Sequence, residues 1–157
     1  MIDRLGRDIT YLRISLTDKC NLRCRYCMPE EGVCIRQHRE MMSEDEIVTA
    51  VEAAASLGIR KIRLTGGEPL VKKNILSICR RVAAVEGIKE VCLTTNGILL
   101  PQLGKQLREA GVNRLNLSLD TLDPEKYAYI TRLGSLDRFR EGLEAAFRAG
   151  FEKIKLN

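Results

Sequence analysis

Short strand-like runs alternate with helical segments along the chain, and this order constrains the fold more than any other feature. The expected strands are Tyr11–Leu16, Lys61–Leu64, Glu90–Thr94, Arg114–Leu119 and Glu152–Asn157. Helices are expected after the capping box Ser43-Glu44-Asp45-Glu46, after Asn74, over Leu100–Ala110, from Asp123-Pro124 and over Leu136–Ala149. This order predicts parallel strands joined by right-handed crossovers, which is an α/β fold.

The strands alternate between apolar and polar residues, whereas parallel strands buried on both faces read as continuous apolar runs. Period two assigns the two sets to opposite faces. The apolar face takes Leu12, Ile14, Leu16, Ile62, Leu64, Val91, Leu93, Leu115, Leu117, Leu119, Ile154 and Leu156. The polar face takes Arg13, Ser15, Lys61, Arg63, Thr65, Cys92, Thr94, Arg114, Asn116, Ser118, Lys153, Lys155 and Asn157. The pattern fits a full or partial barrel whose polar interior holds an anion, or else a two-layer sheet with one solvent face.

Composition narrows the class of protein. The 157 residues are 45% hydrophobic and 30% charged, which excludes a disordered tail, a collagen-like fibre and a small disulfide scaffold. A net charge of +5 favours an anionic partner, but 4% aromatic residues and no Trp argue against nucleic acid. Apolar runs are far too short to span a bilayer, so we expect a cytoplasmic protein with no membrane partner.

The first expected strand leads into a cysteine motif, Cys20, Cys24 and Cys27, with the spacing C-x3-C-x2-C. Three thiolates this close can bind an iron–sulfur cluster or zinc. A [4Fe–4S] cluster with three cysteine ligands leaves one iron open to a substrate. Nearby basic residues are expected to favour the thiolate form, namely Lys19, Arg23 and Arg25.

Other interpretations of the cysteines remain open. A structural zinc site would take Cys34 or His38 as its fourth ligand, and Cys34 could instead close an electron-transfer cluster. Cys79 and Cys92 fit core packing better than chemistry. His38 is the only histidine, so no residue is expected to act as a catalytic acid or base.

At these residues the chain resembles the radical S-adenosylmethionine (SAM) superfamily, whose signature is C-x3-C-x-aromatic-C, with Tyr26 as the aromatic residue. Supporting motifs follow three later strands: Thr65-Gly66-Gly67-Glu68-Pro69, Thr94-Thr95-Asn96-Gly97 and Ser118-Leu119-Asp120. From about Leu5 to Asn157 the chain resembles the MoaA-like GTP 3′,8-cyclases of molybdenum cofactor (molybdopterin) biosynthesis.

The resemblance implies a lyase-type enzyme that converts GTP to 3′,8-cyclo-7,8-dihydro-GTP through a 5′-deoxyadenosyl radical. It implies one open [4Fe–4S] cluster on Cys20, Cys24 and Cys27. Tyr26 and Ser118 would contact SAM, with its methionine end near Gly66, Gly67 and Glu68. GTP would contact Arg13, Arg63, Thr94 and Lys155, with Lys61 adjacent. The implied partners are GTP and an electron donor, and a homodimer stays open.

Members of that family are considerably longer and carry a second cluster on C-terminal cysteines. We therefore expect residues 1–157 to be the N-terminal part of a radical SAM core, a partial (βα) barrel of about five parallel strands truncated before completion. This chain is expected to bind a cluster and SAM without converting GTP by itself. The rival functions are a radical SAM enzyme acting on peptide or tRNA, and a non-catalytic metal-binding fragment.

Overall fold

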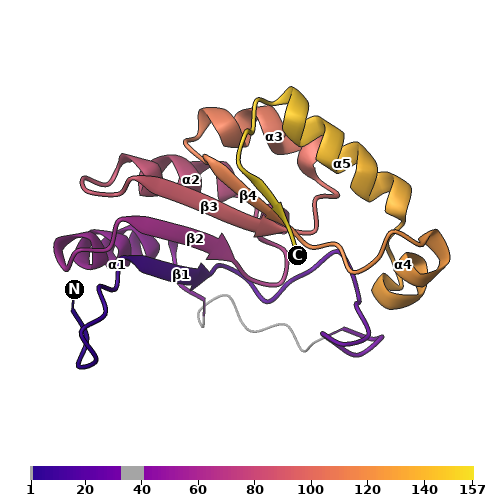
Figure 1. Ribbon diagram of the computed structural model, residues 1–157, viewed down its shortest axis with the longest axis horizontal. Helices are drawn as coiled ribbons and strands as arrows, with labels where there is room; N and C mark the ends of the chain where they lie inside the picture. The colour runs from indigo at the N-terminus through magenta and orange to yellow at the C-terminus, as the bar shows by residue number, and fades with distance from the viewer. Residues whose placement is uncertain (1, 33–40) are drawn as a thin grey trace.

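The computed structural model describes residues 2–32 and 41–157, which contain one sheet of five parallel strands (Figure 1). The strands are β1 (Tyr11–Ser15), β2 (Lys61–Thr65), β3 (Glu90–Thr95), β4 (Arg114–Leu117) and β5 (Ile154–Leu156). They lie in the order β1-β2-β3-β4-β5, so each strand pairs with the next one in the chain. Sequential parallel order is the arrangement of (βα) barrels, and it confirms the predicted α/β class.

Most of the helices pack on the apolar face of this sheet, whereas the one over Pro124–Thr131 lies beyond the carboxyl ends of the strands (Figure 1). The helices are α1 (Glu44–Ser56), α2 (Ile75–Ala84), α3 (Leu100–Glu109), α4 (Pro124–Thr131) and α5 (Leu136–Arg148), with a 3-10 turn η2 (Pro69–Val71). Strand residues such as Ile62 and Leu93 share one core with Val51 of α1, Ile78 of α2 and Phe139 of α5. Among the described residues, no helix combines the length and the apolar character needed to cross a membrane.

Several boundaries differ from the sequence prediction. β4 ends at Leu117 rather than Leu119, and β5 covers only Ile154–Leu156. Asn74 does precede α2, but its side chain donates to Glu44 Oε2 at 2.8 Å instead of capping the helix. Leu156 belongs to the predicted apolar face yet is 47% exposed, because β5 is the edge strand of the sheet.

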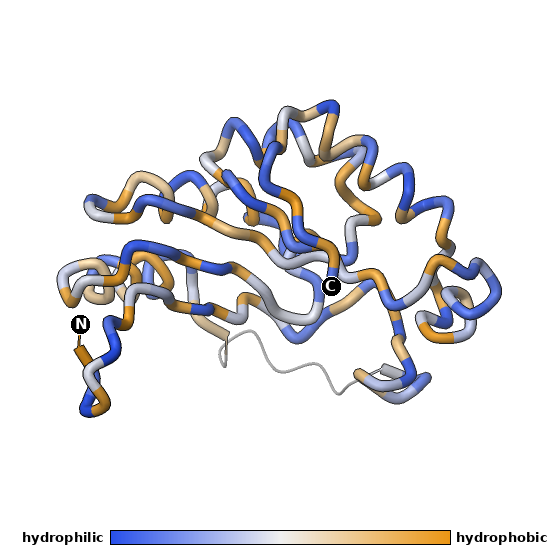
Figure 2. The backbone as a smooth tube through the Cα atoms, in the orientation of Figure 1, coloured by the Kyte–Doolittle hydropathy of each residue, from blue (hydrophilic) through white to orange (hydrophobic). Residues whose placement is uncertain are grey.

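Hydropathy alternates along the strands (Figure 2). Because successive strand residues point to opposite faces, this alternation gives the sheet an apolar face and a polar one. The polar face is exposed at Arg13 and Ser15 on β1. Its centre is not open to solvent: Cys92 and Asn116 are only 0% and 1% exposed. The Cys92 thiol lies 3.5 Å from Asn116 Oδ1, so side chains of the polar face cover one another there.

The start of α1 is expected to depend on its capping box. Ser43 Oγ accepts from the Glu46 N–H at 3.2 Å, and Glu46 Oε2 accepts from the Ser43 N–H at 2.7 Å. Ser43→Ala should lower the free energy of unfolding by about 1 kcal/mol in urea titrations. Thr49→Ala, an exposed change inside the same helix, should cause no loss, since alanine is the better helix former. Equal losses in the two variants would contradict this assignment.

Candidate active site

The predicted cysteines lie on the segment 16–32 that follows β1, here named the cysteine loop. The N–H groups of Cys27 and Met28 donate to the Cys24 carbonyl at 2.9 and 3.0 Å, which forms a tight turn between two of the thiols. The Leu22 N–H lies 3.4 Å from Cys20 Sγ, so that sulfur accepts a backbone hydrogen bond. The three sulfurs are close enough for the charge on one to affect the others.

The electrostatics of the loop differ from the sequence prediction. Burial raises the pKa of the Cys20 thiol, while the Leu22 N–H and the charge of Arg23 lower it by less. Burial is also the main reason why the pKa of Cys24 is raised. Arg23 therefore acts on the pKa of Cys20 in the predicted direction, but burial outweighs its effect. Arg23 also donates to the carbonyls of Cys20 and Leu22 at 2.8 and 2.9 Å.

The chemistry of the donor set fits a cluster with three protein ligands, because three thiols stand within eight residues on one loop. Across residues 2–32 and 41–157, however, no three His, Cys, Asp or Glu side chains are arranged to hold a metal ion. Cys34 and His38, the alternative fourth ligands, lie outside the described residues.

One side of the cysteine loop rests on the two glycines that follow β2. The Gly67 N–H donates to the Thr17 carbonyl at 2.6 Å, and the Glu68 N–H donates to the Lys19 carbonyl at 2.8 Å. A Cβ at Gly66, whose φ is +152°, would lie 2.5 Å from the Thr17 oxygen, and one at Gly67 would overlap the Lys19 oxygen. Because glycine has no Cβ, the backbone that leads into Cys20 can lie close to these two positions. Any other residue would place a Cβ in the same space.

Glu68 links three segments from within the protein. Its side chain is almost fully buried, and its carboxylate accepts from the Leu70 N–H, the Thr95 hydroxyl and the Asn96 N–H at 3.0, 2.7 and 2.8 Å. Burial raises the pKa of this carboxyl, and the three hydrogen bonds oppose that shift. Asn96 in turn donates from Nδ2 to Asn21 Oδ1 at 2.8 Å, beside Cys20. The ends of β2 and β3 are therefore joined to the cysteine loop.

The other side of the cysteine loop rests on α4. The N–H groups of Arg23 and Arg25 donate to carbonyls in the last turn of that helix at 3.1 and 2.9 Å. Arg132, which ends α4 with a φ of +59°, donates to the carbonyls of Arg23 and Met28 at 2.8 and 3.1 Å. The Arg25 guanidinium also lies 4.0 Å from the centre of the Tyr129 ring. Sequence reasoning missed Arg132, because nothing local to it indicates this contact.

The residues predicted to contact SAM all follow the carboxyl ends of β1, β2 and β4 (Figure 1). The Tyr26 hydroxyl donates to Asp120 Oδ2 at 3.1 Å, which connects the cysteine loop to the segment after β4. The Ser118 N–H donates to the Thr95 carbonyl at 3.0 Å, so this segment lies beside the end of β3. Carboxyl ends of parallel strands are where such folds place their ligands.

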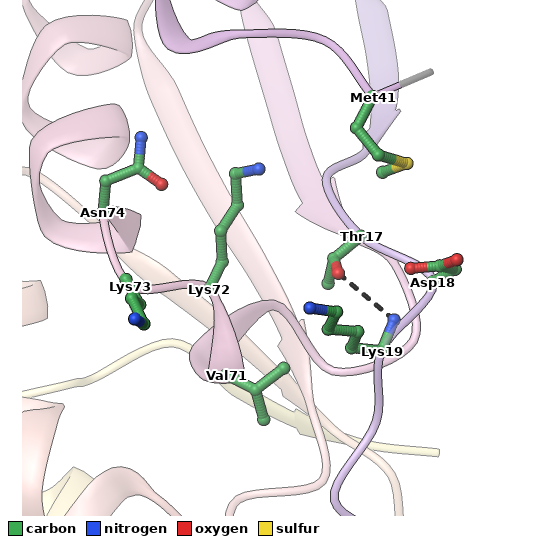
Figure 3. Close-up of a pocket in the computed structure, with 8 residues that line it drawn as sticks. All are labelled: Thr17, Asp18, Lys19, Met41, Val71, Lys72, Lys73 and Asn74. Carbon is green, nitrogen blue, oxygen red and sulfur yellow. Dashed lines mark hydrogen bonds between the residues drawn. The ribbon is translucent and has the colours of Figure 1, made fainter. Parts of the chain in front are cut away.

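A hollow of about 360 Å³ lies between the start of the cysteine loop and the segment that joins η2 to α2 (Figure 3). Three lysines line it, Lys19, Lys72 and Lys73. None of the residues predicted for SAM or GTP lines this hollow. A sequence signal that could have indicated it is the Lys72-Lys73 pair, which begins three residues after Pro69 of the glycine motif.

The residues predicted to contact GTP lie on neighbouring strands of the polar face. The parallel register pairs Arg13 of β1 with Arg63 of β2, and Thr94 of β3 with Asn116 of β4. Asn116 pairs in turn with Lys155 of β5. The sheet therefore brings together residues far apart in sequence, and alternation had predicted their common face.

One predicted cation is already partnered. Lys61 Nζ forms an ion pair with Glu90, a residue that the sequence reasoning did not single out. Lys61 and Arg63 also lie over the Tyr11 ring, at 5.9 and 5.3 Å from its centre. Lys61 is therefore less available to an anion than Arg63.

Four polar atoms on this face are buried without a hydrogen-bond partner in the described part of the chain, and one of them, Glu90 Oε1, belongs to the ion pair with Lys61. The other three are Arg63 Nε, Thr94 Oγ1 and Arg114 Nε. They come from the adjacent strands β2, β3 and β4. A buried polar group without a partner costs about 1–3 kcal/mol, so such groups are normally satisfied by water or a ligand. Here they form a cluster that is chemically suited to an anion.

Comparisons with known proteins agree with this arrangement. Residues 14–157 match the family model described as the radical SAM superfamily. A GTP 3′,8-cyclase from Pelotomaculum thermopropionicum is 55% identical over the whole chain, which covers 48% of that protein. The chain thus spans about half the length of the curated relatives it matches.

Solved structures share the fold at low sequence identity. HydG, a maturase of the [FeFe]-hydrogenase, is 19% identical with a TM-score of 0.76, over 93% of this chain and 34% of that one. The anSMEcpe structure with bound AdoMet is 18% identical with a TM-score of 0.71, over 93% of this chain and 43% of that one. With its cysteine loop, parallel sheet and matched residues, the chain belongs to the radical SAM superfamily.

Proposed function

We propose that residues 1–157 are the N-terminal part of the radical SAM core of a GTP 3′,8-cyclase. In this proposal Cys20, Cys24 and Cys27 hold one [4Fe–4S] cluster. SAM lies at the carboxyl ends of the strands against Tyr26, Gly66, Gly67, Glu68 and Ser118. The triphosphate of GTP lies on the polar face against Arg13, Lys61, Arg63, Thr94 and Lys155. The name shared by the relatives at about half identity supports this choice of substrate.

One observation carries the proposal: the unpartnered polar cluster lies on the sheet whose strand ends carry the cysteine loop. Arg63 and Thr94 supply two of its three buried atoms, and both were predicted to contact GTP. An arginine offers paired donors to phosphate, and in a partly buried setting this contact is strong. A triphosphate would satisfy these groups once the side chains that cover them move aside.

The protein residues have binding and positioning roles in this scheme. When bound, the cluster and SAM would supply the radical chemistry, and the residues named above would hold them. The cysteine loop, held between Gly67 and α4, fixes where that chemistry occurs. Glu68 holds the neighbouring strand ends in place through its three hydrogen bonds. The arginines of the polar face would orient the nucleotide, and an external donor would provide the electron.

Anaerobic reconstitution followed by electron paramagnetic resonance tests the cluster and SAM together. We expect a brown protein with about four irons per chain. The reduced sample should give a [4Fe–4S]⁺ signal whose g values change when SAM is added, because SAM binds the open iron. A colourless zinc protein, or a cluster signal that SAM leaves unchanged, would contradict the proposal.

Arg63→Ala should weaken GTP binding about 30-fold or more, because it removes a partly buried guanidinium from the phosphate. SAM binding should change little, since SAM lies beyond the strand ends. Equilibrium binding of both ligands to the same preparation checks this. Arg140→Ala, an exposed change on α5, is the control and should affect neither ligand. Equal weakening of GTP and SAM by Arg63→Ala would contradict the assignment.

A further inference from the structure

Arg114 opens β4 on the same face as the residues assigned to GTP. Its neighbours Leu115 and Leu117 are fully buried in the helix-covered core, so the alternation of the strand turns Arg114 to the polar side. The register pairs Cys92 with Arg63 on one side and with Arg114 on the other. The two arginines therefore flank Cys92 across the sheet, about 10 Å apart at the backbone, which is two strand spacings.

The surroundings of Arg114 leave its charge unbalanced. Its Nε is buried and has no hydrogen-bond partner among residues 2–32 and 41–157, and the same holds for Arg63 Nε. Within those residues no carboxylate forms an ion pair with Arg114. Glu90 is near enough to feel the charge of Arg114, but it is already paired with Lys61. Lys61, Arg114 and Lys153 thus all act on this one carboxylate.

The residue between the two guanidiniums cannot balance them. Burial raises the pKa of the Cys92 thiol, although Arg63, Lys61 and Arg114 all act to lower it. The thiol is therefore neutral and lies against Asn116 Oδ1. Cys92 is itself fully buried beneath its neighbours, so a group bound by the two arginines would lie over these side chains and not against the thiol.

We propose that Arg114 is a further anion-binding residue of the polar face, and that it and Arg63 hold one phosphate group between them above Cys92. This inference rests on the proposed function, because it takes the phosphate to be part of a nucleoside triphosphate. Two unpaired, partly buried guanidiniums repel each other, and an oxyanion between them removes that repulsion and satisfies both Nε atoms. The guanidinium on each side offers paired N–H donors, which suit a tetrahedral phosphate better than a single lysine ammonium would.

The test compares Arg114→Gln with Arg114→Lys in the purified protein, using isothermal titration with GTP, guanosine and inorganic tripolyphosphate. Arg114→Gln should weaken GTP and tripolyphosphate about 10-fold to 30-fold and leave guanosine and SAM binding unchanged. Arg114→Lys keeps the charge and should recover part of the loss. Arg80→Gln, an exposed arginine of α2, is the matched control and should change nothing.

The possible outcomes separate this inference from the proposed function. If the wild-type protein binds GTP and tripolyphosphate but Arg114→Gln matches Arg80→Gln, Arg114 is not a phosphate ligand and only this inference fails. If the wild-type protein binds neither anion, the assignment of GTP to this face fails as well. A thermal melt of each variant shows whether it is folded. If Arg114→Gln folds poorly, Arg114→Lys becomes the test. An unchanged affinity of Arg114→Lys for both anions, with the salt dependence of the wild-type protein, would overturn the paired-donor contact.

Discussion

Cys24→Ala is expected to abolish the stable iron–sulfur cluster, so that reconstituted protein retains almost no iron or sulfide. Cys24 lies between the other two thiols in sequence, and its carbonyl holds the turn that carries Cys27. With two cysteines left, two irons of the cluster would lack a protein ligand. Two thiolates are too few to hold a stable [4Fe–4S] cluster. Iron and sulfide analysis, together with the visible absorption of the cluster, measures the loss.

Cys79→Ala is the matched control for this prediction. Cys79 is fully buried in α2, and burial alone raises its pKa to about 12, as expected for a packing residue. The variant should lose some stability and keep its iron. Full iron content in Cys24→Ala would contradict the three-cysteine assignment. If the SAM-sensitive signal is lost in Cys24→Ala and kept in Cys34→Ala, the closed site in which Cys34 is a fourth ligand is excluded.

Alternation along the strands carried most of the fold prediction. Each apolar position on β2, β3 and β4 is buried, because a period of two leaves no freedom over which face a residue occupies. Helix starts were predicted correctly at Ser43 and Asp123, whose side chains cap their helices, whereas Asn74 precedes α2 without capping it. β5 was predicted too long, since an edge strand has fewer neighbours to extend its ladder.

The sequence predicted which residue types form the site, but not which of these residues contact one another. The sequence indicated that Lys61 and Arg63 share a face, yet only the structure shows Glu90 beside Lys61 and leaves Arg63 Nε without a hydrogen-bond partner among the described residues. The position of Arg132 against the cysteine loop depends on contacts over a hundred residues apart, which no local pattern encodes. The paired glycines were expected to admit a ligand, and the structure shows that they admit the cysteine loop.

Gly67→Ala is expected to destabilise the apo protein by about 2–4 kcal/mol, because a methyl group there would overlap the Lys19 carbonyl. The backbone of the cysteine loop would have to move away. That movement would break the hydrogen bonds from the Gly67 and Glu68 N–H groups to the Thr17 and Lys19 carbonyls. Urea unfolding of the metal-free protein measures this cost apart from any effect on SAM.

Gly104→Ala is the control, since it makes the same chemical change at a buried glycine of α3. Its Cβ would meet the nearest atom, Ala149 Cβ, at an ordinary 3.5 Å, so it should gain up to about 1 kcal/mol from helix propensity. A loss below about 0.5 kcal/mol in Gly67→Ala would mean that the loop shifts without strain. In that case the second glycine would be needed only for a ligand. If instead the apo protein is destabilised as expected, Gly67 is required to place Cys20 before any cofactor binds.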